Sequence, residues 1–158
     1  MNAETIRKYQ NRTTQQLYNK CVKVTHKLVR ERDKMDGYFN CISCGEIKRI
    51  IIRSTGSNYH ACHFYAAGNY EWMALNLDNI HGGCDQCNFY KSGNLLEYRK
   101  RLVEKIGTRK VDHLDFLASV KPRSRNDIDT FKHYSRFSLI EMIEERDTAL
   151  KSFSGFKL

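Results

Sequence analysis

The sequence predicts an α+β protein, with short strands at its centre and helices on both sides of them. Apolar residues recur at helical spacing near both ends of the 158-residue chain, whereas β-branched residues and turn clusters alternate between residues 38 and 65. Two C-x-x-C pairs, Cys41–Cys44 and Cys84–Cys87, lie in and after this central region. We therefore divide the chain into an N-terminal basic helix (1–36), a cysteine-bearing core (37–107) and a C-terminal helical extension (108–158).

The N-terminal segment is predicted to form one long helix from residue 4 to residue 34. An apolar stripe repeats at spacings of four and three, and no proline or glycine occurs before Gly37. The stripe consists of Leu17, Cys21, Val24 and Leu28. Lys23 and Lys27 lie on the remaining surface, where they either contact phosphates or form a solvated face.

The central strands are predicted to form a β-hairpin. Residues 47–53 are rich in isoleucine and end at the turn cluster of residues 54–58, and residues 59–65 return as the second strand. This second strand carries His60 and His63. A loop over residues 66–78 then leads to Asn79, His81 and the second cysteine pair.

Three further helices are predicted after the cysteines. The first runs from Leu95 to Ile106, with Asn94 as its N-cap, Glu97 three residues later and Gly107 at its end. The second covers residues 111–120 and is followed by a basic linker at residues 121–126. The third begins at Ser138 and runs to about residue 151.

The two cysteine pairs predict a structural zinc site. Each C-x-x-C pair supplies two thiolates from one tight turn, and four thiolates form a closed tetrahedral shell around Zn²⁺. The ligands would be Cys41, Cys44, Cys84 and Cys87, with 39 residues between the pairs. Two disulfides are the alternative, but the N-terminus lacks the apolar core of a signal peptide, so we expect a reducing cytoplasm.

The net charge of +9 is carried by the two flanks of the chain. Residues 1–36 have nine basic and four acidic residues, residues 37–94 have four of each, and residues 95–158 have fourteen basic and ten acidic residues. Basic flanks around a neutral centre favour a polyanionic partner, most simply nucleic acid. No stretch of 18 apolar residues occurs, so we expect no membrane partner.

The central motifs resemble those of the ββα-metal, or HNH, nucleases. They are Cys41-x-x-Cys44, His63, Asn79 and Cys84-x-x-Cys87-Asn88-x-x-Lys91. Within that class the chain looks more specifically like the phage NinG/Rap recombination endonucleases. This second resemblance covers roughly residues 38–120, through His60-Ala-x-His63-Phe, Leu77-Asp-Asn79-Ile-His81, Lys91-Ser-Gly-Asn94 and Lys105-Ile-Gly107.

The resemblance implies a zinc-stapled ββα-metal core and endonuclease activity on branched recombination intermediates, namely Holliday junctions and D-loops. His63 would be the general base, because a histidine titrates near neutral pH. Asn79 would hold the loop or the His63 ring, or serve only as a turn residue. Asn88 would offer an oxygen to a catalytic Mg²⁺ or Mn²⁺, or only cap a helix. Basic residues would contact DNA phosphates: Lys91, Lys23, Lys27, Arg99 and Arg101.

One position departs from the HNH pattern and leaves the catalytic ligands open. An acidic ligand usually stands immediately before the histidine, where this chain has Cys62, or three residues before it in the NinG type, where this chain has His60. We therefore take His60 as the substitute ligand, with Cys62 or water as alternatives. His81 could be a buried hydrogen-bond donor or could support the site, and the sequence does not distinguish the two roles.

The sequence thus predicts a metal-dependent, structure-specific DNA endonuclease in the cytoplasm of a bacterial host. A zinc-dependent DNA-binding protein without catalysis is the rival, and an HNH restriction or homing endonuclease is a third possibility. A junction-cutting enzyme must nick two symmetrically placed strands, so we also expect a homodimer. The stripe of Leu17, Val24 and Leu28 is the predicted interface, unless it packs within one chain.

Overall fold

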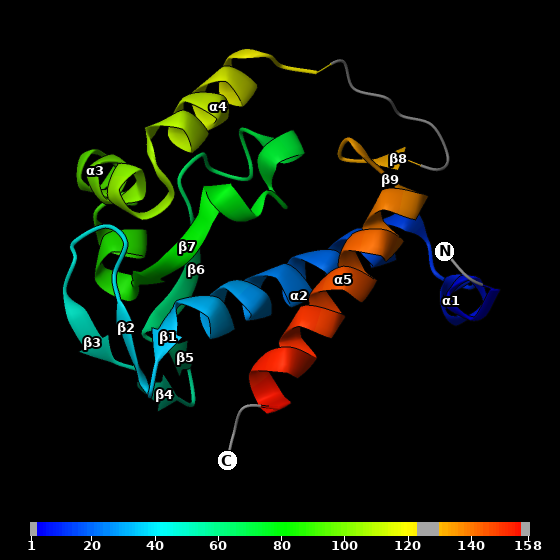
Figure 1. The fold of residues 1–158 in the computed structure, drawn as a ribbon, viewed down its shortest axis with the longest axis horizontal. Helices are drawn as coiled ribbons and strands as arrows, with labels where there is room; N and C mark the ends of the chain where they lie inside the picture. The colour runs from blue at the N-terminus through cyan, green and yellow to red at the C-terminus, as the bar shows by residue number, and fades with distance from the viewer. Residues whose placement is uncertain (1–2, 123–129, 156–158) are drawn as a thin grey trace. The chain divides into compact units, whose positions relative to one another are not determined.

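The computed structural model describes residues 3–122 and 130–155. Along the chain, helices precede and follow a series of short strands, which confirms the mixed α+β class (Figure 1). The elements are α1 (Ala3–Tyr9), α2 (Thr14–Asp33), β1 (Lys34–Met35), β2 (Tyr38–Asn40), β3 (Ile47–Arg49), β4 (Ile52–Arg53), β5 (Gly56–Ser57), β6 (Tyr59–His63), η1 (Glu71–Met73), η2 (Leu77–Asn79), β7 (Ile80–Cys84), the π-helix η3 (Gln86–Tyr90), α3 (Leu95–Ile106), α4 (Thr108–Ser119), β8 (Thr130–Phe131), β9 (Tyr134–Ser135) and α5 (Arg136–Gly155).

Two compact units are present, and they cut across the three predicted segments. One unit comes from residues 1–28 and 122–158, and the other is formed by residues 29–121. Helix α4 therefore belongs with the cysteine-bearing core, because its buried Val111 and Leu114 pack there. Helix α5 belongs with the N-terminal helices instead. Residues 123–126 of the predicted basic linker lie outside the described residues.

The single long N-terminal helix that we predicted is wrong, because the chain breaks between α1 and α2. Thr13 and Gln16 form a capping box that starts α2: Gln16 N donates to Thr13 Oγ1 at 3.2 Å, and Thr13 N donates to Gln16 Oε1 at 3.0 Å. This reciprocal pair satisfies amide groups that an uninterrupted helix would bond elsewhere. The first residues of the chain consequently form a separate short helix.

In the first unit, polar contacts join α5 to α1 and α2. Glu144 accepts hydrogen bonds from Lys8 Nζ at 2.7 Å and Tyr9 Oη at 2.5 Å. Arg146 donates to Cys21 Sγ at 3.1 Å, so the predicted buried position of Cys21 is confirmed. Leu17 is also fully buried within the chain. Leu17 therefore packs within one chain, which is the alternative that the sequence left open. The complete predicted stripe cannot form a dimer interface while Leu17 is buried in this way.

In the second unit, the strand pairing differs from the hairpin that we predicted. Strand β3 pairs back with β2 and places Asn40 opposite Ile47, which closes the first cysteine turn. Strand β6 pairs antiparallel with β7, with Tyr59 opposite Cys84 and His63 opposite Ile80. The strand that carries His63 thus takes its partner from beyond a long loop, and this pairing brings the second cysteine pair to the first.

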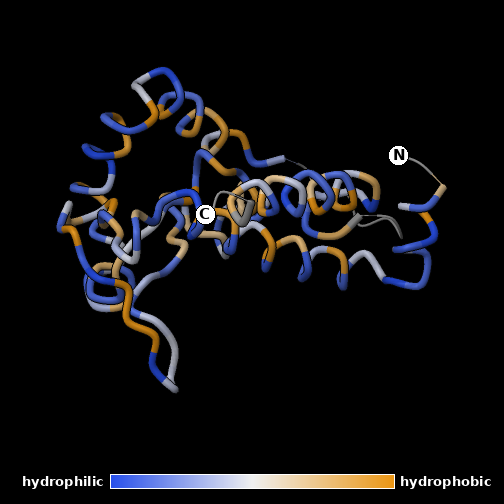
Figure 2. The backbone as a smooth tube through the Cα atoms, turned by 60° about the horizontal axis from the view of Figure 1, so that its bottom comes forward, coloured by the Kyte–Doolittle hydropathy of each residue, from blue (hydrophilic) through white to orange (hydrophobic). Residues whose placement is uncertain are grey.

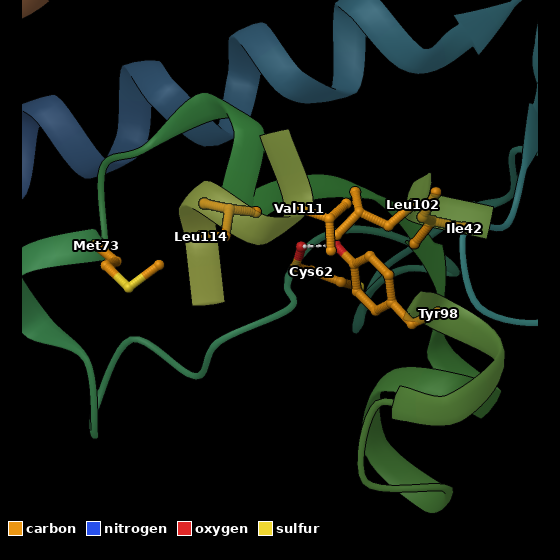
Figure 3. Close-up of a cluster of buried hydrophobic side chains, with 7 residues drawn as sticks. All are labelled: Ile42, Cys62, Met73, Tyr98, Leu102, Val111 and Leu114. Atoms are coloured by element: carbon orange, nitrogen blue, oxygen red, sulfur yellow. Dashed lines mark hydrogen bonds between the residues drawn. The ribbon is translucent and has the colours of Figure 1, made fainter. Parts of the chain in front are cut away.

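The core of the second unit lies between strand β6 and helices α3 and α4. The buried residues are Ile42, Cys62, Met73, Tyr98, Leu102, Val111 and Leu114 (Figure 3). Tyr98 Oη donates to the carbonyl oxygen of Cys62 at 2.9 Å, which ties α3 to the centre of β6. Cys62 Sγ therefore lies in apolar surroundings, where burial raises the pKa of its thiol to about 12.

The C-terminal helices are close to their predicted positions. Helix α3 has the predicted bounds and ends at Gly107, whose φ of +85° suits glycine. Asn94 precedes it but makes no side-chain cap, since its backbone is left-handed at φ +51°. Helix α4 begins at Thr108, before the predicted start. Helix α5 begins at Arg136 rather than at Ser138, because Ser135 Oγ accepts from Ser138 N at 3.1 Å and serves as the cap.

Candidate functional site

The two C-x-x-C pairs converge on one point of the second unit. The Sγ atoms of Cys41, Cys44, Cys84 and Cys87 all lie within 4.8 Å of one another. This spacing fits a tetrahedral ion with four sulfur ligands at about 2.3 Å. Four cysteines clustered in this way suggest a structural zinc, as the sequence predicts. A closed thiolate shell leaves no position open for a substrate, so the centre organises the fold rather than the chemistry.

Backbone groups support the first pair of ligands. Cys84 N donates to Cys41 Sγ at 3.3 Å, and Gly45 N donates to the carbonyl oxygen of Cys41 at 2.8 Å. Gly45 is left-handed at φ +73°, and a side chain there would collide with the guanidinium of Arg101, 2.1 Å from its Cζ. Arg101, which we predicted to contact DNA, therefore packs against the metal centre.

A cavity of about 730 Å³ adjoins the end of strand β6. His63 and Asn88, two predicted site residues from different elements, both line it. Aromatic and apolar side chains make up much of the wall, with Asn69 and Arg99 as further polar groups. The structure thus brings His63 and Asn88 to one concave site, and cavities of this size hold small ligands in many proteins.

His63 is held in one orientation by the loop that follows it. Its Nε2 lies 3.0 Å from the carbonyl oxygen of Ala74. Because a carbonyl only accepts hydrogen bonds, Nε2 carries the proton, and the neutral ring has its basic lone pair on Nδ1. Burial lowers the pKa of His63, which keeps the ring neutral near pH 7. A neutral, oriented imidazole is the form that accepts a proton.

Asn79 fixes the loop that orients His63. It is fully buried, and its Nδ2 donates to the carbonyl oxygens of Tyr65 at 3.0 Å and Met73 at 3.3 Å. Its Oδ1 accepts from Tyr65 N at 2.8 Å. Asn79 thus joins both ends of the loop through its side chain. The expectation that it holds the loop agrees with these contacts.

His60 lies apart from the cavity. Successive side chains of a strand point to opposite faces, so His60 and His63, three residues apart, face opposite sides of β6. The His60 ring makes an edge contact with Phe89 at 4.9 Å between centroids. Burial lowers its pKa. The structure does not bring His60 together with His63 and Asn88, and Cys62, the other candidate ligand, is in the apolar core.

The predicted phosphate contacts fall into two groups. Lys23, Lys27 and Lys91 are exposed. Arg99 is instead held by Asp115, with Nη1 to Oδ1 at 2.9 Å and Nη2 to Oδ2 at 2.5 Å. This two-point ion pair joins α3 to α4 and occupies the guanidinium that we predicted to contact DNA.

Sequence reasoning missed a buried polar cluster around Asp33. This carboxylate binds Arg32 Nε at 2.8 Å, Lys105 Nζ at 2.8 Å and Gly82 N at 2.8 Å. Burial opposes its ionisation, but the hydrogen bonds from Arg32 and Lys105 outweigh this effect and lower the pKa of Asp33 to about 2. The cluster connects the end of α2 to β7 and α3.

His81 belongs to the same cluster, which settles the question that the sequence left open. Its Nε2 donates to the carbonyl oxygen of Asp78 at 2.9 Å, and its Nδ1 accepts from Arg32 Nη2 at 3.1 Å. Burial, with the nearby cations, lowers the pKa of His81 to about 4, so the ring is neutral near pH 7. His81 is a buried donor and acceptor in the scaffold.

These features define a mixed α+β protein with a four-cysteine centre beside a histidine-lined cavity. Comparison with known proteins assigns the chain to a family. Residues 2–144 match the family described as Bacteriophage Lambda NinG protein, and the chain belongs to this family. Among the described residues, no helix is long and apolar enough to cross a bilayer.

Individual relatives match about half of the chain. It is 36% identical over 87 residues to "Protein ninG" of Escherichia phage lambda and to "Protein ninG" of Salmonella phage P22. A third relative, from Escherichia phage 933W, is 34% identical over the same length. Each match covers 55% of this chain but only 38% of the relative's own length. No solved structure matches the chain significantly.

Proposed function

We propose that this NinG-family protein is a metal-dependent endonuclease of HNH type that cuts branched DNA during phage recombination, including Holliday junctions and D-loops. The observation that carries the proposal is the setting of His63, which lines the cavity and whose Nε2 is fixed by the Ala74 carbonyl. The order of β6, β7 and the helices after Cys87 supports it, because two strands followed by a helix form the nuclease motif that the sequence resembles.

In this proposal His63 acts as a general base. Its Nδ1 takes a proton from water, and the oxygen of that water attacks the phosphorus of the scissile phosphodiester. The bond to the 3′ oxygen breaks, and that oxygen takes a proton from solvent, which gives a 5′-phosphate and a 3′-hydroxyl. Asn79 acts through the loop by keeping the Ala74 carbonyl in place.

A divalent ion such as Mn²⁺ or Mg²⁺ would stabilise the negative charge that develops on the phosphate. The donor set around the cavity fits such an ion only in part. Asn88 supplies an amide oxygen, but no carboxylate of the described residues lines the cavity. Mg²⁺ prefers carboxylates and water, so the ion would depend on the phosphate oxygens of bound DNA. Asn88 is the residue of this chain that would hold it.

Exposed basic residues would hold the DNA backbone, with Lys91 nearest in sequence to the cavity wall and Lys23 and Lys27 on the N-terminal unit. We also propose a homodimer on the junction, because two strands must be cut. Its interface differs from the stripe that the sequence predicts, since Leu17 is buried.

Cleavage of a labelled four-way junction tests the proposal. Wild-type protein should nick the junction in Mn²⁺, and His63→Ala should lower the single-turnover rate by about 10²- to 10⁴-fold, the usual contribution of a general base. His113→Ala is the matched control, because His113 is exposed on α4. Absence of any metal-dependent cleavage by wild-type protein would favour the second candidate, a zinc-dependent DNA-binding protein without catalysis. The lack of a carboxylate in the cavity wall is the observation that favours this candidate.

A further inference from the structure

The hairpin β4–β5 projects from the second unit as a finger, which we define as residues 51–57. Figure 2 shows this segment extending away from the rest of its unit, with an apolar stretch next to a hydrophilic tip. Every residue from 51 to 56 is exposed. Ile51 is 44% exposed and Ile52 is 84% exposed. Contiguous exposed apolar side chains, such as these neighbouring isoleucines, are a common mark of binding surfaces.

The base of the finger is held by one buried side chain. Asn58 is 8% exposed; its Oδ1 accepts from Ile51 N at 2.8 Å and its Nδ2 donates to the carbonyl oxygen of Arg49 at 3.0 Å. Its backbone N also donates to the Ile51 carbonyl oxygen at 3.2 Å, and its own carbonyl accepts from Asp85 N at 3.2 Å. The exposed isoleucines therefore stand on a fixed base, and their placement needs little further ordering on binding.

The charges around the finger select its partner. Arg49 and Arg53 flank the three consecutive isoleucines and are exposed, and neither joins an ion pair among the described residues. No acidic residue occurs between residues 47 and 70. A second copy of the chain would bring these cations against one another across a two-fold interface, which is unfavourable. A polyanion with apolar surfaces between its charges satisfies both features, and DNA is such a polymer.

The sheet that precedes the finger in the chain also carries a row of exposed side chains. Strand pairing places Met35, Tyr38 and Arg49 in one row across β1, β2 and β3. Met35 is 53% exposed and Tyr38 is 47% exposed. The row thus combines an apolar side chain, an aromatic ring and a cation, the set that proteins use to hold unstacked nucleotides.

We infer that the finger is a wedge that inserts Ile52 between bases at a DNA branch point, while Arg49 and Arg53 hold the adjacent phosphates. Apolar side chains are inserted between base steps by many DNA-bending proteins, at the cost of unstacking. At a branch point the bases are already partly unstacked, so that cost is smaller than in a continuous duplex. The finger would therefore select branched over linear DNA, and in this respect the inference rests on the proposed function.

The test separates the wedge from catalysis by measuring binding to purified, zinc-loaded protein without added Mg²⁺ or Mn²⁺ and without a chelator. A four-way junction with 2-aminopurine at the branch point should become brighter with wild-type protein, because unstacking relieves quenching. Ile51→Ser/Ile52→Ser should lose this signal and bind the junction about tenfold more weakly, the loss of roughly one stacked base, with little change for linear duplex. Phe116→Ser is the matched control, since Phe116 is an apolar residue of α4 that is 60% exposed.

Each outcome bears on a different claim. If the serine variant keeps the fluorescence change and the junction preference while wild-type protein cuts the junction, the wedge is wrong and the endonuclease proposal stands. If the finger governs binding but wild-type protein never cuts, the wedge stands and the endonuclease proposal fails. If the serine substitutions change the sedimentation of the free protein instead of its DNA affinity, the finger is a contact between copies and the inference is overturned.

Discussion

The side-chain nitrogen of Asn79 lies 3.3 Å from the carbonyl oxygen of Met73, one peptide unit before the carbonyl group that binds His63. The buried amide of Asn79 therefore bonds the peptide next to the one that contacts His63. Under the proposed function, Asn79 should affect both cleavage and stability, and different measurements separate the two effects.

Asn79→Ala should slow junction cleavage by about tenfold to 100-fold, because a small displacement of the base costs rate. It should also destabilise the fold by about 2 to 4 kcal/mol, since buried groups of Tyr65 and Met73 lose their partner. Urea unfolding and single-turnover cleavage measure the two effects. Asn11→Ala is the control, because Asn11 is exposed and does not line the cavity. An unchanged rate per folded molecule would remove Asn79 from the positioning of His63.

The protonation state of His63 predicts the pH dependence of cleavage. Burial lowers its pKa below the ordinary value of about 6.5, so the base is unprotonated at a lower pH than a free histidine. The single-turnover rate should rise with pH, with its midpoint below pH 6.5. The rate profile at fixed ionic strength measures this, and a midpoint well above 6.5 contradicts the assignment.

Zinc should be required for the fold of the second unit. Cys44→Ser removes a ligand of the four-sulfur cluster and should lower the zinc content. It should also unfold strands β2 and β3, which the first cysteine turn connects. Cys62→Ala is the control, since Cys62 is buried in the apolar core and outside the cluster. Metal analysis with circular dichroism checks both variants. Equal zinc loss in the two variants, or a wild-type fold insensitive to chelator, contradicts the site.

His81 should make stability depend on pH between about 4 and 6.5. Its folded pKa of about 4 lies below the ordinary value, so its contribution is complete above about pH 6.5 and is lost as the pH falls toward 4. The shift corresponds to about 3 kcal/mol at most. His81→Gln should have a shallower decline in unfolding free energy over this range. The thiolates titrate in both proteins, so the difference between them isolates His81, and parallel curves count against the assignment.

Lys91 and Arg99 should behave differently although both were predicted to contact phosphates. Lys91→Ala should weaken junction binding and reduce the salt dependence of log K by about one. Arg99→Ala should chiefly reduce stability, because it breaks the two-point pair with Asp115. Binding titrations over a range of salt, with thermal unfolding, distinguish the two. An equal loss of salt dependence in both variants shows that Arg99 also reaches the phosphates.

The sequence was informative where the determinants were local. The cysteine spacing predicted the metal centre, and the apolar stripe with Gly107 predicted α3 to its ends. The strand that pairs with the His63 strand could not be predicted from local patterns. Strand β7 lies beyond a long loop, and the loop residues show no strand pattern. The cluster of Asp33, Lys105 and His81 was missed for the same reason, since its members come from three separated elements.

The break after α1 was a different kind of error. The Thr13-x-x-Gln16 capping box is visible in the sequence and indicates a helix start. The prediction of one helix rested on the apolar stripe alone. The opposite placement of His60 and His63 was also accessible, because strand alternation separates residues three apart.

The position of Cys84 has a consequence for which side chain of β6 faces the cavity. This residue is a metal ligand and also stands opposite Tyr59 in the β6–β7 pair. Strand β7 has the sequence Ile-His-Gly-Gly-Cys, and adjacent glycines specify alignment weakly, so a slip by one residue would turn every side chain of β6 to the other face. The four-cysteine cluster therefore fixes the register of β6 against β7, because it holds Cys84 in place. Under the proposed function, a chain misaligned by one step would present Cys62 in place of His63 to the cavity, and it would not cut DNA although every proposed catalytic residue is present.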